Sequence, residues 1–189
     1  MRTSFTVGLL LGSARAKGWT AKLGHALVNL APATMAIRPI ALADLPLYHE
    51  ELEQPSPPPS WTRFRAEVAA VDALLFVTPE YNRSVPAALK NAIDIGSSPD
   101  DCSVWSGKPA AIATFSTGML GGFGANHHLR QSLVFLDVPV MPQPEVYLSQ
   151  IERLFDDEGT LLAGPGPVLL TTFVQAFQAW CSSWIDARR

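Results

Sequence analysis

The eighteen residues from Thr78 to Ile95, TPEYNRSVPAALKNAIDI, indicate the fold of this chain more directly than any other stretch. They follow a short apolar run, ALLFV at residues 73–77, which is typical of a buried strand in a parallel sheet. Ser84 and Pro86 are residue types that favour the start of a helix, and a helix is expected from residue 85 to about 95. The stretch therefore predicts a strand, a loop and a helix in succession.

The loop between this strand and this helix is Pro79-Glu80-Tyr81-Asn82. Open α/β sheets bind ligands at such loops, outside the carboxyl ends of the strands. Proline fixes φ and asparagine tolerates turn geometry, so the loop is expected to be rigid and to expose backbone amides. These properties suit a flat polar heterocycle. The alternative is a surface turn with good helix capping.

Strand-like and helix-like segments alternate along the whole chain, which favours βαβ units and a parallel sheet. The expected strands are residues 5–11, 37–40, 73–77 and 109–115, with a fifth beginning at 138–141. The expected helices are 19–30, a helix capped by Ser60 and ending near 71, 85–95, one that includes 127–136, and 168–187. The proline-rich segment 45–59 is expected to be a surface connection. This order predicts an α/β fold of flavodoxin-like type, a three-layer sandwich with strand order 2-1-3-4-5, in one domain over residues 1–189.

A second loop, residues 12–20, joins the first expected strand to the first expected helix. Free amides and the positive end of the helix dipole make this position an anion site. Gly12 permits close backbone approach, Ser13 and Thr20 supply hydroxyl donors, and Arg15 can bind a phosphate with two hydrogen bonds. The loop has neither the G-x-G-x-x-G pattern of dinucleotide folds nor a Walker A pattern. Taken alone, it could also be a plain helix-entry turn.

A third loop, residues 116–124, carries four glycines after the expected strand 109–115. So many glycines favour a backbone that passes close to a ligand, and the alternative is a flexible loop. The candidate residues in this loop are Ser116, Thr117, Gly118, Gly121 and Gly122.

Together, the three loops resemble the NADPH-dependent FMN reductase family, flavodoxin-like proteins that include chromate and quinone reductases. The family's PEYNxSxPxxLKNAID stretch, which packs against the flavin ring, matches residues 79–94, and its phosphate-binding G-S-x-R matches residues 12–15. The resemblance spans roughly residues 4–147 and implies FMN as cofactor and NADPH or NADH as co-substrate. The cofactor-binding residues that it implies are Gly12, Ser13, Arg15, Thr20, Pro79, Glu80, Tyr81, Asn82, Ser84, Ser116, Thr117, Gly118, Gly121 and Gly122.

The chain departs from the family pattern at two positions. Gly18 stands where the family usually has a second phosphate-binding serine, and Thr20 or Lys17 is a candidate to compensate. Gly124 stands where some members have an arginine, for which Arg83 is the nearest candidate by sequence.

The resemblance implies hydride transfer from NAD(P)H through FMN to a small-molecule acceptor, in a ping-pong cycle. The acceptor would be a quinone, an azo compound, a free flavin or a metal oxyanion such as chromate. The sequence shows no pairing of a nucleophile with a base, which agrees with chemistry borne by a cofactor. The alternative is a non-catalytic, flavodoxin-like electron carrier with a protein partner, against which a net charge of −3 argues weakly.

The composition excludes several other function classes. A net charge of −3 gives no electrostatic reason to expect nucleic acid or an anionic membrane as partner. No apolar stretch is long enough to cross a bilayer, and the run from Phe5 to Leu11 is too short for a signal peptide. Cys102 and Cys181 are expected to be free thiols in a reducing cytoplasm. The four histidines are expected to have packing or surface roles and no metal.

Three further expectations concern surfaces. The helix 85–95 has a wide apolar spread, and family resemblance implies that it meets a second subunit, in a homodimer or a homotetramer built from dimers. The alternative is a helix buried wholly in its own domain. The acidic residues Asp44, Glu50, Glu51 and Glu53 are expected to be solvated, and Trp180 and Trp184 to form the core face of the last helix.

Overall fold

The structure is a computed structural model that describes residues 4–99 and 102–187. Within these residues, a five-stranded parallel sheet has the order β2-β1-β3-β4-β5, which confirms the predicted flavodoxin-like order. The strands are β1 (Phe5–Leu11), β2 (Met35–Ile40), β3 (Ala73–Pro79), β4 (Ala110–Phe115) and β5 (Val146–Leu148). The helices are α1 (Trp19–Leu30), α2 (Pro59–Ala69), α3 (Ala87–Ser97), α4 (Phe123–Phe135) and α5 (Pro165–Ala187), with short 3-10 helices η1 (Glu50–Glu53) and η2 (Ile151–Leu154).

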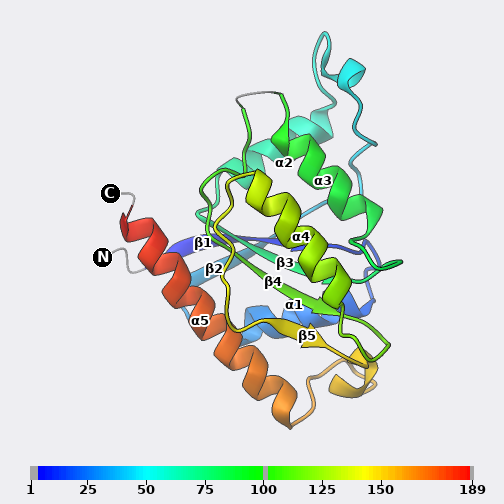
Figure 1. Ribbon diagram of the computed structural model, residues 1–189, viewed down its shortest axis with the longest axis vertical. Helices are drawn as coiled ribbons and strands as arrows, with labels where there is room; N and C mark the ends of the chain where they lie inside the picture. Colours follow the sequence, from blue (N-terminus) through cyan, green and yellow to red (C-terminus); the bar gives the residue numbers. More distant parts are fainter. Residues whose placement is uncertain (1–3, 100–101, 188–189) are drawn as a thin grey trace.

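The helices form two layers on the two faces of the sheet (Figure 1). Helices α1 and α5 cover one face, and α2, α3 and α4 cover the other. Every residue of β3 is buried, and its side chains alternate between the layers: Leu75 and Val77 pack toward α1 and α5, while Leu74 and Phe76 pack toward the other three helices. This double burial is why the segment has an unbroken apolar sequence.

The last strand lies later in the chain than the sequence analysis predicted. The fifth strand was expected to begin at residues 138–141, but those residues make a single isolated bridge to β4, between Val140 and Ala110. Prolines at positions 139, 142 and 144 have no N–H group to donate to a ladder, and regular pairing starts only at Val146.

Two helix starts also differ from expectation. Helix α2 is capped by the Pro58 carbonyl, which accepts hydrogen bonds from the amides of Trp61 (2.9 Å) and Thr62 (3.2 Å), so Ser60 lies inside the helix and is not its cap. Helix α3 begins at Ala87 because the backbone of Ser84 is already paired with Tyr81 in a tight hairpin.

The wide apolar spread of α3 is explained by the protein's own core. Leu89, Ala92, Ile93 and Ile95 are all buried against the sheet and its neighbouring helices. The core of a single chain thus accounts for these four side chains, and a subunit interface at α3 stays a prediction. Trp180 and Trp184 were expected to form the core face of α5, but both are only half-buried. The fully buried face of α5 contains Leu170, Phe173, Val174, Phe177 and Cys181.

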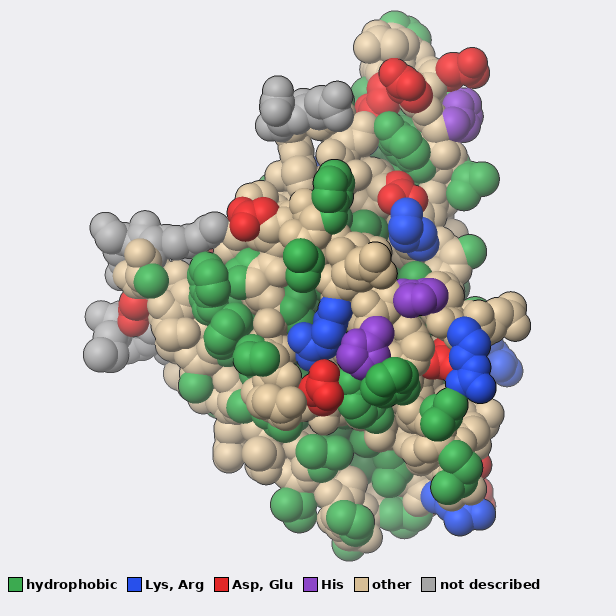
Figure 2. Space-filling view, viewed as in Figure 1, with side chains coloured by type: hydrophobic (Ala, Val, Ile, Leu, Met, Phe, Trp, Pro, Cys, Tyr) green, Lys and Arg blue, Asp and Glu red, His purple; other side chains and the backbone are tan. Residues whose placement is uncertain are grey.

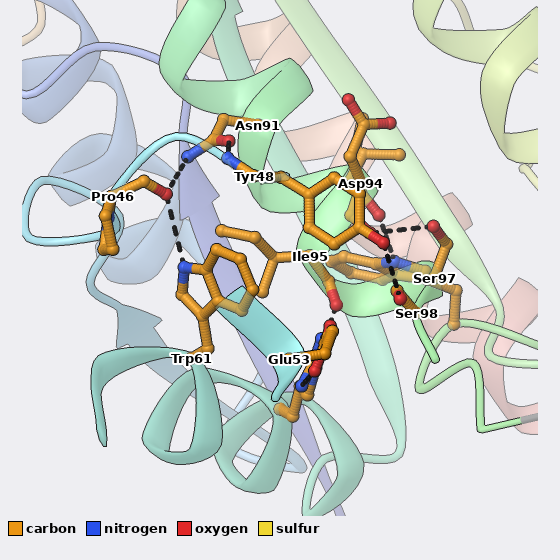
Figure 3. A network of polar contacts seen from close by, with 12 residues as sticks. Pro46, Tyr48, Glu53, Trp61, Asn91, Asp94, Ile95, Ser97 and Ser98 are labelled. Atoms are coloured by element: carbon orange, nitrogen blue, oxygen red, sulfur yellow. Dashed lines mark hydrogen bonds and ion pairs between the residues drawn. The ribbon is translucent and has the colours of Figure 1, made fainter. Parts of the chain in front are cut away.

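The proline-rich connection before α2 contains η1 and projects at the top of Figure 1. Its base is held by Asn91 of α3, whose Oδ1 accepts a hydrogen bond from the Tyr48 amide at 2.8 Å. The Asn91 Nδ2 donates to the carbonyls of Leu45 (3.3 Å) and Pro46 (3.0 Å), and the Pro46 carbonyl also accepts from Trp61 Nε1 at 3.2 Å (Figure 3). The asparagine of the LKNAID stretch thus anchors a segment more than forty residues upstream.

The acidic residues of this connection are not all solvated, contrary to expectation. Glu53 has a side chain only 12% exposed and forms a two-pronged ion pair with Arg65 of α2. The hydrogen bond from Arg65 lowers the pKa of Glu53 below its ordinary value. Asp44 pairs with Arg63 at 2.8 Å, whereas the side chain of Glu51 is 95% exposed.

Replacing Asn91 by alanine should destabilise the protein, because the Tyr48 amide and two carbonyls lose a buried partner. We expect the free energy of unfolding to fall by about 1–3 kcal/mol. Urea unfolding of the flavin-free chain measures it, with Asn29→Ala as control, since Asn29 lies exposed on α1 and its loss should cost less than about 0.5 kcal/mol. Equal effects of the two substitutions would contradict the anchoring role of Asn91.

Candidate functional site

Three loops meet at the carboxyl ends of β1, β3 and β4, which are neighbours in the sheet. They enclose a cleft of about 170 Å³. Its lining residues come from all three loops and are Ser13, Arg15, Gly18, Trp19, Thr20, Pro79, Glu80, Tyr81, Phe115, Ser116 and Thr117. The sequence analysis placed its three candidate loops at one edge of the sheet, and the structure brings them together there.

One end of the cleft is the N-terminus of α1. Its N-cap residue is Gly18, and no side chain caps the first amides of the helix in the described part of the chain. Thr20 is 2% exposed, and the guanidinium of Arg15 is exposed at the cleft, with no carboxylate partner among the described residues. Uncapped amides, a positive helix end and an arginine together make a site for an anion.

Tyr81, the first residue of the tight hairpin Tyr81–Ser84, lines the cleft. The two ends of the hairpin exchange backbone hydrogen bonds, Tyr81 N to Ser84 O (2.9 Å) and Ser84 N to Tyr81 O (3.0 Å). Asn82 (φ 51°) and Arg83 (φ 65°) are both left-handed, as the turn requires, and asparagine accepts this conformation more readily than arginine does. The Tyr81 hydroxyl reaches toward Ser13 Oγ at 3.5 Å, which brings the hairpin over the first loop.

The other side of the hairpin faces away from the cleft. Asn82 and Ser84 line a separate, larger groove between α3 and α4, and Ser84 Oγ lies 3.0 Å from His128 Nδ1. Both residues were predicted to contact the cofactor, and neither lines the cleft. His128 keeps a surface role, as expected from the sequence.

The third loop owes its glycines to packing against its own chain. A Cβ at Gly121 (φ 59°) would lie 2.6 Å from the Tyr147 carbonyl carbon, and one at Gly122 (φ 83°) would lie 2.8 Å from Thr114 Cβ. Both residues wedge the loop onto β4 and β5, and the cleft is lined instead by Ser116 and Thr117. Gly12 has a similar role, since a Cβ there would collide with Thr78 Oγ1.

Eight of the fourteen predicted cofactor-binding residues line the cleft, and Gly12, Asn82, Ser84, Gly118, Gly121 and Gly122 do not. The sequence analysis missed Trp19 and Phe115 as lining residues. The signal for Phe115 was its place as the last residue of a buried strand. Trp19 is the first residue of α1, and its ring stacks on Phe155 with centroids 6.0 Å apart.

Metal ligands and thiols were the other candidates for chemistry in the sequence. No group of three or more His, Cys, Asp or Glu side chains is arranged to hold a metal ion within residues 4–99 and 102–187. Cys102 and Cys181 are free thiols, as predicted. Burial raises the pKa of the Cys181 thiol, which makes it a poor nucleophile.

Comparison with known proteins identifies the family. The sequence matches the family described as NADPH-dependent FMN reductase over residues 5–153. A quinone reductase of Pseudomonas putida is 49% identical over 189 residues, which cover 100% of this chain and 99% of that protein. An NAD(P)H-dependent FMN reductase of Pseudomonas aeruginosa is 42% identical over 169 residues, covering 89% of this chain and 91% of that protein. The solved structure of FerB, a flavoenzyme NAD(P)H:(acceptor) oxidoreductase from Paracoccus denitrificans, has a TM-score of 0.88 at 32% identity and covers 95% of this chain and 98% of that one.

This chain belongs to the NADPH-dependent FMN reductase family. Membership confirms the predicted family and enzyme class, an oxidoreductase that uses FMN and NAD(P)H.

The cleft of this FMN reductase family member fits the cofactor in two respects. The uncapped amides of α1, with Arg15 and Thr20, suit the FMN phosphate. The lining also includes the aromatic residues Tyr81 and Phe115 and the rigid Pro79, which suit a flat ring. Gly18 has no hydroxyl and Lys17 does not line the cleft, whereas Ser13 and Thr20 do.

Replacing Arg15 by alanine should weaken FMN binding, because it removes a charge-assisted hydrogen bond to the phosphate worth about 1.5–3 kcal/mol. The dissociation constant should rise by about ten- to a hundred-fold. Fluorescence titration of the flavin-free protein measures it. Lys17→Ala is the matched control, since Lys17 is an exposed cation in the same loop that lies outside the cleft. Equal affinity of the Arg15 variant and the control would mean that Arg15 is only a solvated loop residue.

Proposed function

We propose that this chain reduces quinones to quinols with NAD(P)H, using FMN held in the cleft. The observation that carries the proposal is the meeting of an anion site and a rigid aromatic hairpin at the ends of three neighbouring strands. The acceptor class is supported by relatives named quinone reductase, from Pseudomonas putida and, at 39% identity, from Escherichia coli. One quinone, one NAD(P)H and one proton yield one quinol and one NAD(P)⁺.

The protein's part in this reaction is to bind and orient. Bound FMN supplies the hydride chemistry. Ser13, Arg15 and Thr20 would hold the phosphate at the start of α1. Pro79, Tyr81 and the backbone of Glu80 would lie along one edge of the ring, and Ser116 and Thr117 along another. The lining includes hydroxyls, Arg15 and Glu80, and no histidine or cysteine among the described residues. In this proposal the quinol oxygens take their protons from solvent.

The alternative function, a non-catalytic electron carrier, is compatible with the fold but is less well supported by the similar proteins. A flavodoxin from Pseudomonas aeruginosa has a TM-score of 0.57 at 20% identity, which indicates a common fold alone. The relatives in the range of 38–49% identity carry reductase names. A weak net charge of −3 also fits small neutral acceptors better than a strongly charged protein partner.

Anaerobic mixing with NADPH separates the two functions. The FMN-loaded protein should lose its visible flavin absorbance within seconds and regain it when a benzoquinone is added, with one quinone consumed per NADPH. A flavin that NADPH and NADH both leave oxidised would contradict the enzyme and favour the carrier. A flavin that is reduced by NADPH but reoxidised only by chromate or an azo compound would contradict the acceptor class.

The proposal extends to a homodimer, or a homotetramer built from dimers. Its support lies on α4 and the loop before it, where Met119 (73% exposed), Leu120 (53%), Phe123 (52%), Val134 (73%) and Phe135 (88%) are exposed. Figure 2 shows apolar side chains intermixed with histidines and charges of both signs over the face on which α4 lies. Tyr81 and Arg83, 47% and 71% exposed, would then lie near the partner.

The predicted place of action is the cytoplasm. No helix of the described residues is long and apolar enough to cross a membrane. The free thiols Cys102 and Cys181 support a reducing compartment, which would also supply NAD(P)H.

A charge on the exposed end of α4 should prevent assembly. Phe135→Asp places a carboxylate in the proposed interface, and light scattering at micromolar concentration should then show a monomer where the unchanged protein is a dimer or larger. Val168→Asp is the matched control, because Val168 is 67% exposed on α5. A monomeric unchanged protein, or a Phe135 variant that assembles like the control, would contradict this interface.

A further inference from the structure

The hairpin and the third loop form two walls of the cleft, and one side chain joins them. Glu80 precedes the hairpin, and its side chain is only 9% exposed. Its carboxylate lies at the first turn of α4, where Oε2 accepts a hydrogen bond from the Ala125 amide at 3.2 Å.

Helix α4 needs this contact. Its N-cap residue, Gly122, has no side chain that could bind the first amides of the helix. Ala125 is the third residue of α4, and the third amide is one that capping side chains ordinarily bind. A carboxylate at this end also interacts favourably with the helix dipole. Glu80 therefore caps α4 from a different loop, forty-five residues away in sequence.

The backbone of Glu80 forms a hydrogen bond at the start of the third loop, whose end leads into α4. Its amide donates to the Phe115 carbonyl at 3.2 Å, directly before residues 116–122 begin. Glu80 thus binds Phe115, before the third loop, and Ala125, after it. The loop is also tied to the end of β5 and the residues after it, because the Ser116 amide donates to the Leu148 carbonyl (3.0 Å) and the Gln150 amide donates to the Gly118 carbonyl (3.1 Å).

Gly124 makes the close approach possible. A Cβ at this position would lie 2.8 Å from the Arg83 carbonyl oxygen and 3.0 Å from Glu80 Oε2. Because residue 124 has no side chain, the hairpin can pack directly against the first turn of α4. Arg83 closes the outer side of the contact, with Nη1 at 3.5 Å from Glu80 Oε1.

We propose that Glu80 is a positioning residue for the cleft, whose carboxylate clasps α4 and so fixes the distance between the hairpin and the third loop. This role rests on the proposed FMN site. The carboxylate itself need not touch the flavin, and its effect on the flavin passes through the two loops that it holds.

Two variants of Glu80 test the clasp. Glu80→Ala removes the acceptor, and hydrogen exchange at the Ala125 amide should speed up by about tenfold or more. The FMN dissociation constant of the full chain should rise by about tenfold as well. Glu80→Gln keeps an acceptor oxygen and should stay within about threefold of the unchanged protein on both measures. Glu51→Ala is the control, since Glu51 is a solvated carboxylate far from the cleft.

A third variant acts on the same contact without changing Glu80. Gly124→Ala should favour the helix by intrinsic propensity. The proposed role of Glu80 nevertheless predicts weaker FMN binding in this variant, because the new methyl group pushes the hairpin away from α4. This variant keeps the test decisive if Glu80→Ala does not fold.

The outcomes distinguish a failure of the positioning role of Glu80 from a failure of the proposed function. FMN affinity and Ala125 exchange in Glu80→Ala that match the Glu51 control would overturn the positioning role. So would a Gln variant that loses as much affinity as the Ala variant while Ala125 stays protected. If the unchanged protein itself does not bind FMN, the proposed function fails, while the exchange rate of Ala125 still reports on the clasp.

Discussion

The site depends on one constraint: β1, β3 and β4 are adjacent and parallel, so their carboxyl ends lie at the same edge of the sheet. Parallel pairing requires a helical crossover after each strand, and the loops that start those crossovers must therefore meet. The burial of β3 on both faces fixes the sheet in the middle of the fold. Every residue of the cleft takes its place from this arrangement.

The arrangement explains why the cleft has few reactive side chains. A cofactor that carries the hydride needs a fixed phosphate, a fixed ring and an open side, and backbone groups can supply most of this. The loops of the cleft accordingly contain rigid turns, with two left-handed residues in the hairpin and two glycines packed closely against β4 and β5. The exposed residues Met119, Leu120 and Phe123 lie in or next to these turns, where the proposed second copy would border the cleft.

The sequence predicted the sheet order and the three loops because each rests on a local pattern: an apolar run, a glycine or proline, and a helix start. It could not predict contacts made over long distances. Glu80 was expected at the cofactor and lines the cleft, but no local pattern indicated that its carboxylate would bind an amide on α4. The start of β5 was misplaced because the apolar run at residues 138–141 was read as a strand, although its proline cannot donate to a ladder. The wide apolar spread of α3 was read as a sign of an interface, whereas the core of the single chain already accounts for most of it.

The most direct test of the account is to map the FMN contacts on the backbone amides. Two-dimensional ¹H–¹⁵N spectra of the flavin-free protein would be recorded while FMN is added. The largest shifts should fall on Ser13, Trp19, Thr20, Tyr81 and Ser116, around the cleft. Shifts confined to the groove between α3 and α4, at Lys90, His128 and Gln131, would contradict the account, because they would place the flavin on the other side of the hairpin.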